Sequence, residues 1–192
     1  RYGSEAHSGK RSATRTDPIA QQLFDMGMIC AGKSSLPEYG FVPSTEFPSA
    51  APTRNPWNTA RTAGGSSGGA AVLVASGVVP IAHAADGGGS IRVPASCCGL
   101  VGLKPSRGRL PHSGMHEPLV GLVTDGVVTR SVRDTAVYLA EAERLDPAKR
   151  LAPVGLVTEP VTRPQRIGLV TESPTGAMLD EPTRAAVRAA GE

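Results

Sequence analysis

The sequence predicts an α/β fold in which helices cover both faces of a β-sheet. Short apolar segments of strand length alternate with segments of helical spacing, and helix caps mark several starts and stops. Strands between two layers of helices are apolar on both faces, and the candidate strands have this character. A length of 192 residues suits one domain with a hydrophobic core, and the chain has no internal repeats.

The first helix is predicted to begin after Asp17, because an N-cap acceptor there precedes a proline at the first helical position. Ile19, Leu23 and Phe24 give this helix its apolar face. Gly27 is a typical stop signal for a helix. The helix is therefore expected to pack through these three side chains.

Five elements are predicted in the middle of the chain. Residues 28–32 have the apolar character of a short buried strand, and residues 41–63 form a long irregular loop rich in Pro, Thr, Asn and Arg. A buried helix over residues 69–76 and a buried strand over residues 78–85, interrupted at a proline, follow. A second short helix is expected from residue 90 up to a glycine at position 99.

Three elements are predicted in the last third. Residues 131–143 form an amphipathic helix whose inward side chains are Val132, Ala136, Leu139 and Ala140. Residues 166–171 are predicted as a strand. A last helix, capped around Asp180, is expected to run to the end of the given sequence.

Two glycine-crowded loops that carry serines lie one helix and one strand apart. The first covers residues 64–69 and contains Ser66 and Ser67, and the second covers residues 86–95 and contains Ser90. Glycine is typical where a backbone takes unusual dihedrals or approaches another group closely. Acyl transfer needs a nucleophilic hydroxyl and backbone N–H donors directed at the developing oxyanion. The two loops therefore predict a serine hydrolase site.

Across these loops and their flanks, the chain resembles the amidase signature family of serine hydrolases. The matching segments are residues 32–40, 55–58, 64–69, 87–95 and 98–105. The resemblance implies an αβα fold with a mixed β-sheet, of which residues 1–192 form a single partial domain. The core of the signature lies at approximately residues 55–105.

The resemblance also implies a Lys–Ser–Ser triad. Ser90 matches the nucleophile, Ser66 matches a bridging serine that follows a cis peptide bond, and Ser67 matches a neighbour that holds the network. The other functional positions surround the nucleophile: oxyanion-hole donors at Gly87, Gly88 and Gly89, and a loop-supporting ion pair between Asp86 and Arg92.

The triad lysine of the family lies upstream of the segment that matches residues 1–4. Lys33 matches a different lysine of the family, and Lys10 matches none. The chain as given is therefore expected to be a fragment truncated at both ends, with two of the three triad residues and no activity by itself.

The resemblance implies an amidase that cleaves the carbon–nitrogen bond of linear or cyclic small-molecule amides through a seryl acyl-enzyme, with neither metal nor organic cofactor. It leaves room for a homodimer of the full-length form. Two alternatives stay open: an inactive fragment or scaffold domain, and an ammonia-releasing glutamine amidase of the kind that serves an amidotransferase. Val93 favours the general amidases, because the amidotransferase type typically has Gln at this position.

Composition excludes several other classes of function. The net charge of +3 is spread along the chain without a basic stripe, so nucleic-acid binding is not expected. No apolar run approaches the roughly 20 residues of a membrane span. Cys30, Cys97 and Cys98 have no disulfide or metal-site spacing and are expected to be small buried hydrophobes of a cytoplasmic protein.

Other interpretations of the same residues predict different contacts. Residues 27–34 fit the Walker A pattern, but a phosphate-binding loop opens a helix, whereas Leu36 and Pro37 follow here. A Ser90–His83–Asp86 triad is the second rival, although His83 within an apolar strand is expected to be structural.

Simpler roles are also open for the serine pair and for Trp57. Ser66 and Ser67 have a simpler interpretation as caps of the following helix. Trp57 is expected to anchor its loop.

Overall fold

A sheet of three short strands lies at the centre of the larger of two units. The computed structural model describes residues 3–7, 13–111, 121–146, 151–173 and 175–191. The chain divides into the units Arg1–Thr158 and Glu159–Glu192. In the first unit, β1 (Ile81–Asp86), β3 (Thr124–Thr129) and β2 (Val101–Gly102) lie in the order β1-β3-β2, and both pairs are antiparallel.

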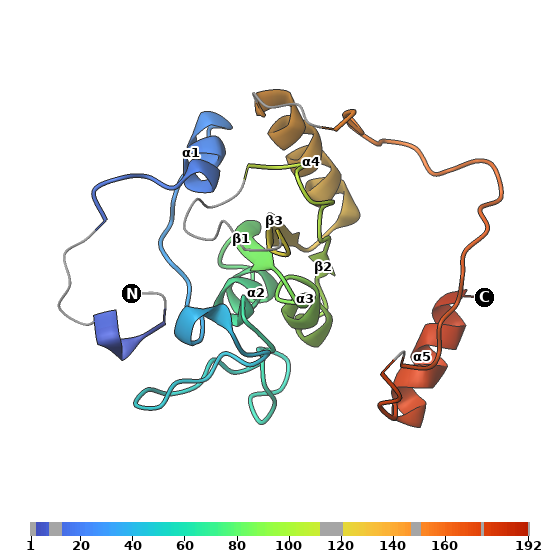
Figure 1. The fold of residues 1–192 in the computed structure, drawn as a ribbon, viewed down its shortest axis with the longest axis horizontal. Coiled ribbons are helices and arrows are strands. Elements are labelled where there is room, and N and C mark those ends of the chain that lie inside the picture. The colour runs from blue at the N-terminus through green and yellow to red at the C-terminus, as the bar shows by residue number, and fades with distance from the viewer. Residues whose placement is uncertain (1–2, 8–12, 112–120, 147–150, 174, 192) are drawn as a thin grey trace. The chain divides into compact units, whose positions relative to one another are not determined.

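Helices cover both faces of this sheet, so the predicted α/β class is confirmed. Figure 1 shows α2 (Gly68–Ala75) and α3 (Arg92–Cys98) on one side of the strands, with α1 (Pro18–Asp25) and α4 (Val132–Leu145) on the other. Two short 3-10 helices, Glu5–His7 and Glu38–Gly40, complete the helices described in the first unit.

The alternation of side chains along β1 and β3 divides the core into two layers. Ala84 and Val128 belong to the layer of α2 and α3, where they pack with Ile91 and three other apolar side chains, Ala70, Val74 and Ala95. Val127 belongs to the opposite layer, with Leu110, Tyr138 and Ala142. Since Asp86 shares its face with Ala84, the end of β1 delivers this carboxylate to the α2–α3 side.

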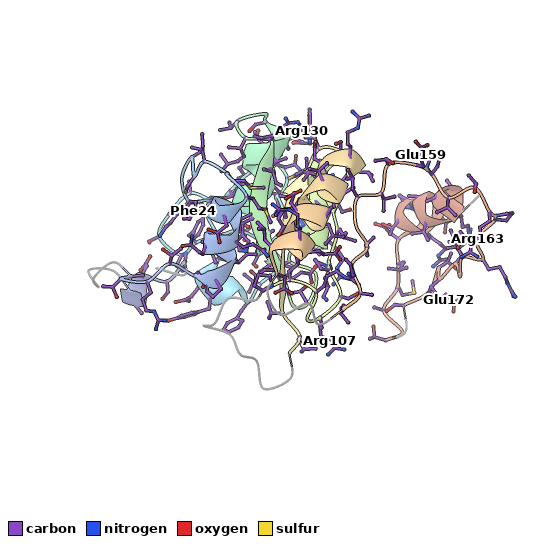
Figure 2. All side chains as sticks on the ribbon, turned by 90° about the horizontal axis from the view of Figure 1, so that it is seen from above. Phe24, Arg107, Arg130, Glu159, Arg163 and Glu172 are labelled. Carbon is purple, nitrogen blue, oxygen red and sulfur yellow. The ribbon has the colours of Figure 1, made fainter. Side chains whose placement is uncertain are left out.

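The first helix begins and ends as predicted. The Asp17 carboxylate accepts a hydrogen bond from the Ile19 amide at 3.3 Å, and Gly27 takes a φ of +81° after the helix. The expected apolar face is wrong at Phe24, labelled in Figure 2, because this ring is exposed. Gln22 is buried there instead and donates from Nε2 to the Ala142 carbonyl of α4 at 2.9 Å.

Two predicted strands do not form, and a third is shorter than expected. Residues 28–32 and 166–171 have no strand structure, and Ile29 is 95% exposed. An apolar run becomes a strand only when a neighbouring strand pairs with its backbone, and none does so within the described residues. β1 begins at Ile81 rather than Val78, directly after the proline that lacks a ladder donor.

Helix α4 has the predicted position but a different buried face. Ser131 caps it by accepting from the Asp134 amide at 3.1 Å, while Val132 is exposed. The buried positions are Thr135, Tyr138, Ala142 and Glu143. Thr135 and Glu143 can be buried because they find hydrogen-bond partners: the Thr135 hydroxyl lies 2.8 Å from that of Thr129, and the Glu143 carboxylate accepts from the Val154 amide at 2.8 Å.

The second unit contains one described helix, α5 (Glu181–Gly191). Asp180 caps it as predicted, since its carboxylate accepts from the Thr183 amide at 2.8 Å. Within the described residues, none of the helices is long and apolar enough to cross a membrane.

Replacing Ile91 by Ala should destabilise the first unit, because Ile91 is fully buried between the sheet and its two covering helices. We expect the free energy of unfolding, measured by urea denaturation, to fall by about 2–5 kcal/mol. Val132→Ala is the control, since that side chain is exposed and its removal should change stability by less than about 0.5 kcal/mol. Equal losses in the two variants would contradict the packing described.

Candidate active site

The first serine loop, residues 64–69, lies buried between neighbouring segments of backbone. Ser66 is buried, and the peptide bond between Gly65 and Ser66 is cis, as the resemblance predicted. A Cβ atom at Gly65 would lie 2.7 Å from the Ser44 amide nitrogen, so only glycine allows this approach. The glycines of this loop therefore serve close contact of one backbone with another.

Two residues that were not predicted as site residues hold this loop in place, although one of them, Ser35, lies in the matching segment 32–40. The Thr45 hydroxyl donates to the Gly64 carbonyl at 2.9 Å and accepts from the Gly68 amide at 3.2 Å. The Gly69 amide donates to the Ser35 carbonyl at 3.2 Å. Both residues come from irregular segments far away in the chain, where no periodicity marks a contact.

Ser67 does not cap the helix that follows it. The Ser67 side chain makes no capping hydrogen bond to α2, and its hydroxyl instead accepts from the Ala85 amide of β1 at 3.4 Å. The capping interpretation of Ser67 is therefore wrong, because the hydroxyl joins the loop to the sheet.

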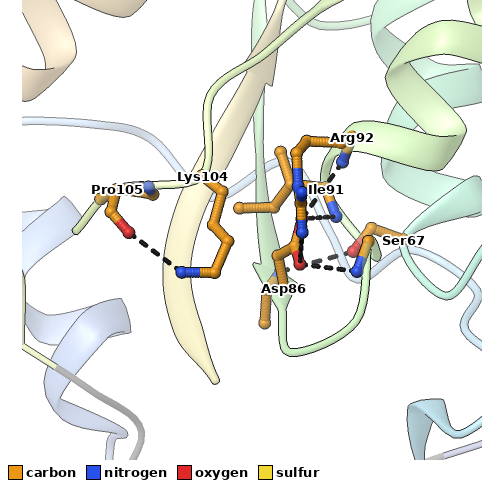
Figure 3. A network of polar contacts seen from close by, with 8 residues as sticks. Ser67, Asp86, Ile91, Arg92, Lys104 and Pro105 are labelled. Atoms are coloured by element: carbon orange, nitrogen blue, oxygen red, sulfur yellow. Dashed lines mark hydrogen bonds and ion pairs between the residues drawn. The ribbon is translucent and has the colours of Figure 1, made fainter. Parts of the chain in front are cut away.

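The second serine loop follows β1 and is organised by the buried carboxylate of Asp86. The Arg92 guanidinium donates to it twice, from Nε at 2.8 Å and from Nη2 at 2.9 Å, which confirms the predicted ion pair (Figure 3). The carboxylate also accepts from the backbone amides of Gly89 at 2.7 Å, Ile91 at 3.3 Å and Arg92 at 3.4 Å. One side chain thus fixes the course of the backbone on both sides of Ser90.

These contacts keep Asp86 ionised at neutral pH. Burial by itself raises the pKa of this carboxyl, but the hydrogen bonds from Arg92 and from the amides of Gly89 and Ile91 outweigh it and lower the pKa below its ordinary value. The ionised form is the one that accepts all five hydrogen bonds, so the charge and the shape of the loop depend on each other.

The backbone amides before Ser90 fall into two groups. The Gly89 amide is buried and donates to Asp86. The amides of Gly87 and Gly88 belong to exposed residues and donate to no partner in the described part of the chain. Of the three glycines that the resemblance assigns to the oxyanion hole, two therefore have a donor to offer in this structure.

A hydrogen bond joins the two serine loops. The Ser67 amide donates to the Ser90 carbonyl at 3.3 Å, next to the Asp86 network in Figure 3. Ser90 is partly exposed and Ser66 lies one residue before the donor. The loops that carry the two predicted reactive serines are thus adjacent.

The far end of α3 is held by the segment that begins at Asn55. The Asn55 side-chain amide donates to the Cys97 carbonyl at 2.6 Å, and the Trp57 indole donates to the Cys98 carbonyl at 2.7 Å. Trp57 is an anchor of its loop, as predicted. With Asp86 at the start of α3 and these two groups at its end, the helix that follows Ser90 is fixed at both ends.

The rival sites do not form. His83 lies on the opposite face of the sheet from Asp86, and its Nε2 atom lies 2.7 Å from the Asp125 carboxylate. Residues 27–34 open no helix, and Lys33 is exposed. The Lys104 ammonium donates to the Pro105 carbonyl at 3.2 Å (Figure 3), and neither described lysine is hydrogen-bonded to a reactive serine.

The cysteines differ from the prediction at two of three positions. Cys98 is buried, and burial, followed by the neighbouring Cys97, raises the pKa of its thiol to about 11. Cys30 is exposed in an irregular segment, and Cys97 is exposed although α3, which carries it, buries Pro94, Ala95 and Cys98. Among the described residues, no group of three or more His, Cys, Asp or Glu side chains is arranged to hold a metal ion.

Comparison with known proteins identifies relatives along most of the chain. A profile of the Amidase family matches residues 2–192. A Mycobacterium tuberculosis protein named amidase AmiC is 55% identical over 163 residues, which are 84% of this chain and 34% of that protein. The chain thus spans about a third of the length of the curated relatives it matches.

Two solved structures are similar to this chain. The structure of 6-aminohexanoate cyclic dimer hydrolase complexed with substrate has a TM-score of 0.75 at 35% identity, covering 93% of this chain and 39% of that one. One of the subunits of glutamyl-tRNA(Gln) amidotransferase from Thermotoga maritima has a TM-score of 0.66 at 37% identity, covering 71% and 30%.

Replacing Asp86 by Asn should destabilise the first unit, because the carboxylate holds the turn between β1 and α3. The neutral amide has one acceptor oxygen for donors that now share two, so we expect the free energy of unfolding at pH 7 to fall by about 1.5–3 kcal/mol. The pKa of Asp86 is lower in the folded state than in the unfolded state, where it is about 3.9. The ionised carboxylate therefore contributes its full stabilisation at pH values above the unfolded-state pKa. This stabilisation is lost as the pH falls through the folded-state pKa.

Denaturation of both proteins between pH 7 and pH 3 measures this difference. The difference in the free energy of unfolding between wild type and Asp86→Asn should be largest at neutral pH and become smaller below about pH 4. Asp134→Asn, at an exposed position of α4, is the matched control and should cost less than about 0.5 kcal/mol. If this difference in the free energy of unfolding does not change with pH, the role of the ionised carboxylate is contradicted.

Proposed function

Because this chain belongs to the Amidase (amidase signature) family, we propose that the complete protein hydrolyses the carbon–nitrogen bond of an amide by acyl transfer to Ser90. The observation that carries the proposal is the juxtaposition of the two serine loops. The Ser67 amide donates to the Ser90 carbonyl, so the loop of Ser66 lies against the loop of the nucleophile. Acyl transfer requires such a second group beside the attacking hydroxyl.

The first half of the reaction is attack on the carbonyl carbon of the amide. Ser66 takes the proton from the Ser90 hydroxyl, and the Ser90 oxygen forms the bond to carbon. By resemblance, a lysine from outside residues 1–192 accepts the proton from Ser66. Proton transfer by a positioned group contributes about 10²–10⁴-fold to such a step.

The exposed amides of Gly87 and Gly88 are the donors that we assign to the oxyanion. Each essential donor of an oxyanion hole lowers the barrier by about 3–4 kcal/mol. We assign the Gly89 amide to Asp86 instead, since that bond measures 2.7 Å and the residue is buried. Asp86 and Arg92 then support the site by fixing the backbone from which both donors project.

The second half of the reaction releases the products. Ser66 returns the proton to the leaving nitrogen as the carbon–nitrogen bond breaks, which leaves an acyl group on Ser90. Ser66, again relaying to the lysine, then takes a proton from water, whose oxygen attacks the acyl carbon. As the ester bond breaks, Ser66 returns the proton to the Ser90 oxygen and the acid is released. Every bond and proton in this sequence is accounted for by the two serines, the lysine and water, without a metal or an organic cofactor.

The substrate that we propose is a small linear or cyclic amide. The likeness to the cyclic dimer hydrolase, over 93% of this chain, supports an amide of this kind. The likeness to the amidotransferase protein supports a second candidate, release of ammonia from glutamine, whereas Val93 favours the first. A cytoplasmic location, a homodimer and the inactivity of residues 1–192 alone stay predictions.

A fluorophosphonate probe tests the assignment of the nucleophile in the complete protein. Peptide mass spectrometry should find the probe on Ser90, and Ser90→Ala should abolish both labelling and turnover of an aryl amide. Ser66→Ala should lower kcat by at least about 100-fold, because the proton relay is lost.

Ser76→Ala is the matched control, since Ser76 lies at the exposed end of α2 and should be dispensable. Full labelling in Ser90→Ala would refute the assignment. Turnover of glutamine with none of simple amides would select the second candidate instead.

A further inference from the structure

We infer that Thr45 is a positioning residue for the reaction, because its hydroxyl sets the shape of the loop that carries Ser66. The inference rests on the proposed function of Ser66 and Ser90. Thr45 lies in the irregular segment before Asn55 and is fully buried. A buried hydroxyl needs hydrogen-bond partners, and the partners of this one are all backbone groups of the serine loop.

The hydroxyl of Thr45 joins the two sides of the loop. It donates to the Gly64 carbonyl at 2.9 Å, two residues before Ser66, and accepts from the Gly68 amide at 3.2 Å, two residues after it. It also lies 3.5 Å from the carbonyl of Ser66 itself. A single atom therefore fixes the distance between the two ends of the segment on which Ser66 stands.

The fit between Thr45 and the loop leaves little freedom. A Cβ atom at Gly68 would lie 2.2 Å from the Thr45 hydroxyl oxygen, so the glycine is what lets this oxygen reach the amide. Thr45 is itself held, because its carbonyl accepts from the Thr53 amide at 2.9 Å. The same loop is joined to the loop of Ser90, because the Ser67 amide donates to the Ser90 carbonyl. The loop that carries Ser66 is thus held by Thr45 through Gly64 and Gly68 and joined to the loop of Ser90 through Ser67.

This geometry predicts an effect on rate rather than on substrate binding. The described hydrogen bonds of the Thr45 hydroxyl all go to the loop of Ser66, so we expect its loss to leave the amides of Gly87 and Gly88 in place. A shift of Ser66 by about 1 Å is expected to cost about 10²-fold in the proton-transfer step, since that step depends on the relative position of two hydroxyls. KM should change little, because the ground-state contacts are unchanged.

The test compares Thr45→Val with Thr45→Ser in the complete protein. Valine keeps the branched shape and removes the hydroxyl, and we expect kcat to fall about 10- to 100-fold while KM stays within about threefold. The rate at which a fluorophosphonate labels Ser90 should fall in parallel. Serine keeps the hydroxyl, and both rates should stay within about threefold of wild type.

Thr129→Val is the matched control for loss of a buried threonine hydroxyl. Thr129 is equally buried, with its oxygen 2.8 Å from the Ser131 carbonyl and from the Thr135 hydroxyl, at the end of β3 far from Asp86. The Thr129→Val variant should have a lower free energy of unfolding than wild type but an unchanged kcat. Wild-type kcat and labelling in Thr45→Val, or an equal loss in Thr129→Val, would overturn the inference while the proposed function stands.

Hydrogen exchange separates this inference from the proposed function. Mass spectrometry of peptides that span residues 63–70 should show exchange at least about fivefold faster in Thr45→Val than in Thr45→Ser. If wild type is neither labelled nor active, the proposed function fails, and the exchange result alone decides whether Thr45 holds the loop. Equal exchange in the two variants would overturn the inference in every case.

Discussion

The buried carboxylate of Asp86 is the interaction on which the rest of the site depends. It ends β1, accepts both arms of the Arg92 guanidinium and binds three backbone amides around Ser90. A buried charge is tolerated only when its hydrogen bonds are complete. Here the donors are backbone amides and the Arg92 guanidinium, all from the segment that directly follows β1. The carboxylate therefore gives the strand-to-helix turn a single conformation. The same bonds take the Gly89 amide out of reach and leave those of Gly87 and Gly88 exposed.

The second constraint is the close approach of backbone segments around Ser66. Gly65 lies against Ser44, and Gly69 lies so close to Ser35 that a Cβ atom would come within 2.4 Å of its carbonyl oxygen. The loop that carries Ser66 is thus in contact with the irregular segments before Asn55 and with the loop of Ser90. Long irregular loops inside a compact unit are usually functional, and here residues of such segments contact the loop that carries Ser66.

Local signals predicted much of this structure. The caps of α1 and α5, the positions of α2 and α3 and the Asp86–Arg92 pair follow from residues close together in sequence. The two strands that failed, residues 28–32 and 166–171, depend on pairing partners that no short window reveals. The contacts that Thr45 and Ser35 make with the serine loop were not predicted for the same reason, because they form across long separations without periodicity, although Ser35 lies in the matching segment 32–40. The exposure of Phe24 shows that hydrophobicity alone does not select the buried face when Gln22 finds a carbonyl to bind.

Transfer of the acyl group of an amide substrate to Ser90 is the step that most needs a direct measurement. The complete protein is quenched with acid during turnover of a slowly hydrolysed aryl amide and digested, and its peptides are weighed. We expect the peptide containing Ser90 to gain the mass of the acyl group, and the gain to disappear once substrate is exhausted. Turnover without any acylated peptide, or with the acyl group on another residue, would contradict this mechanism.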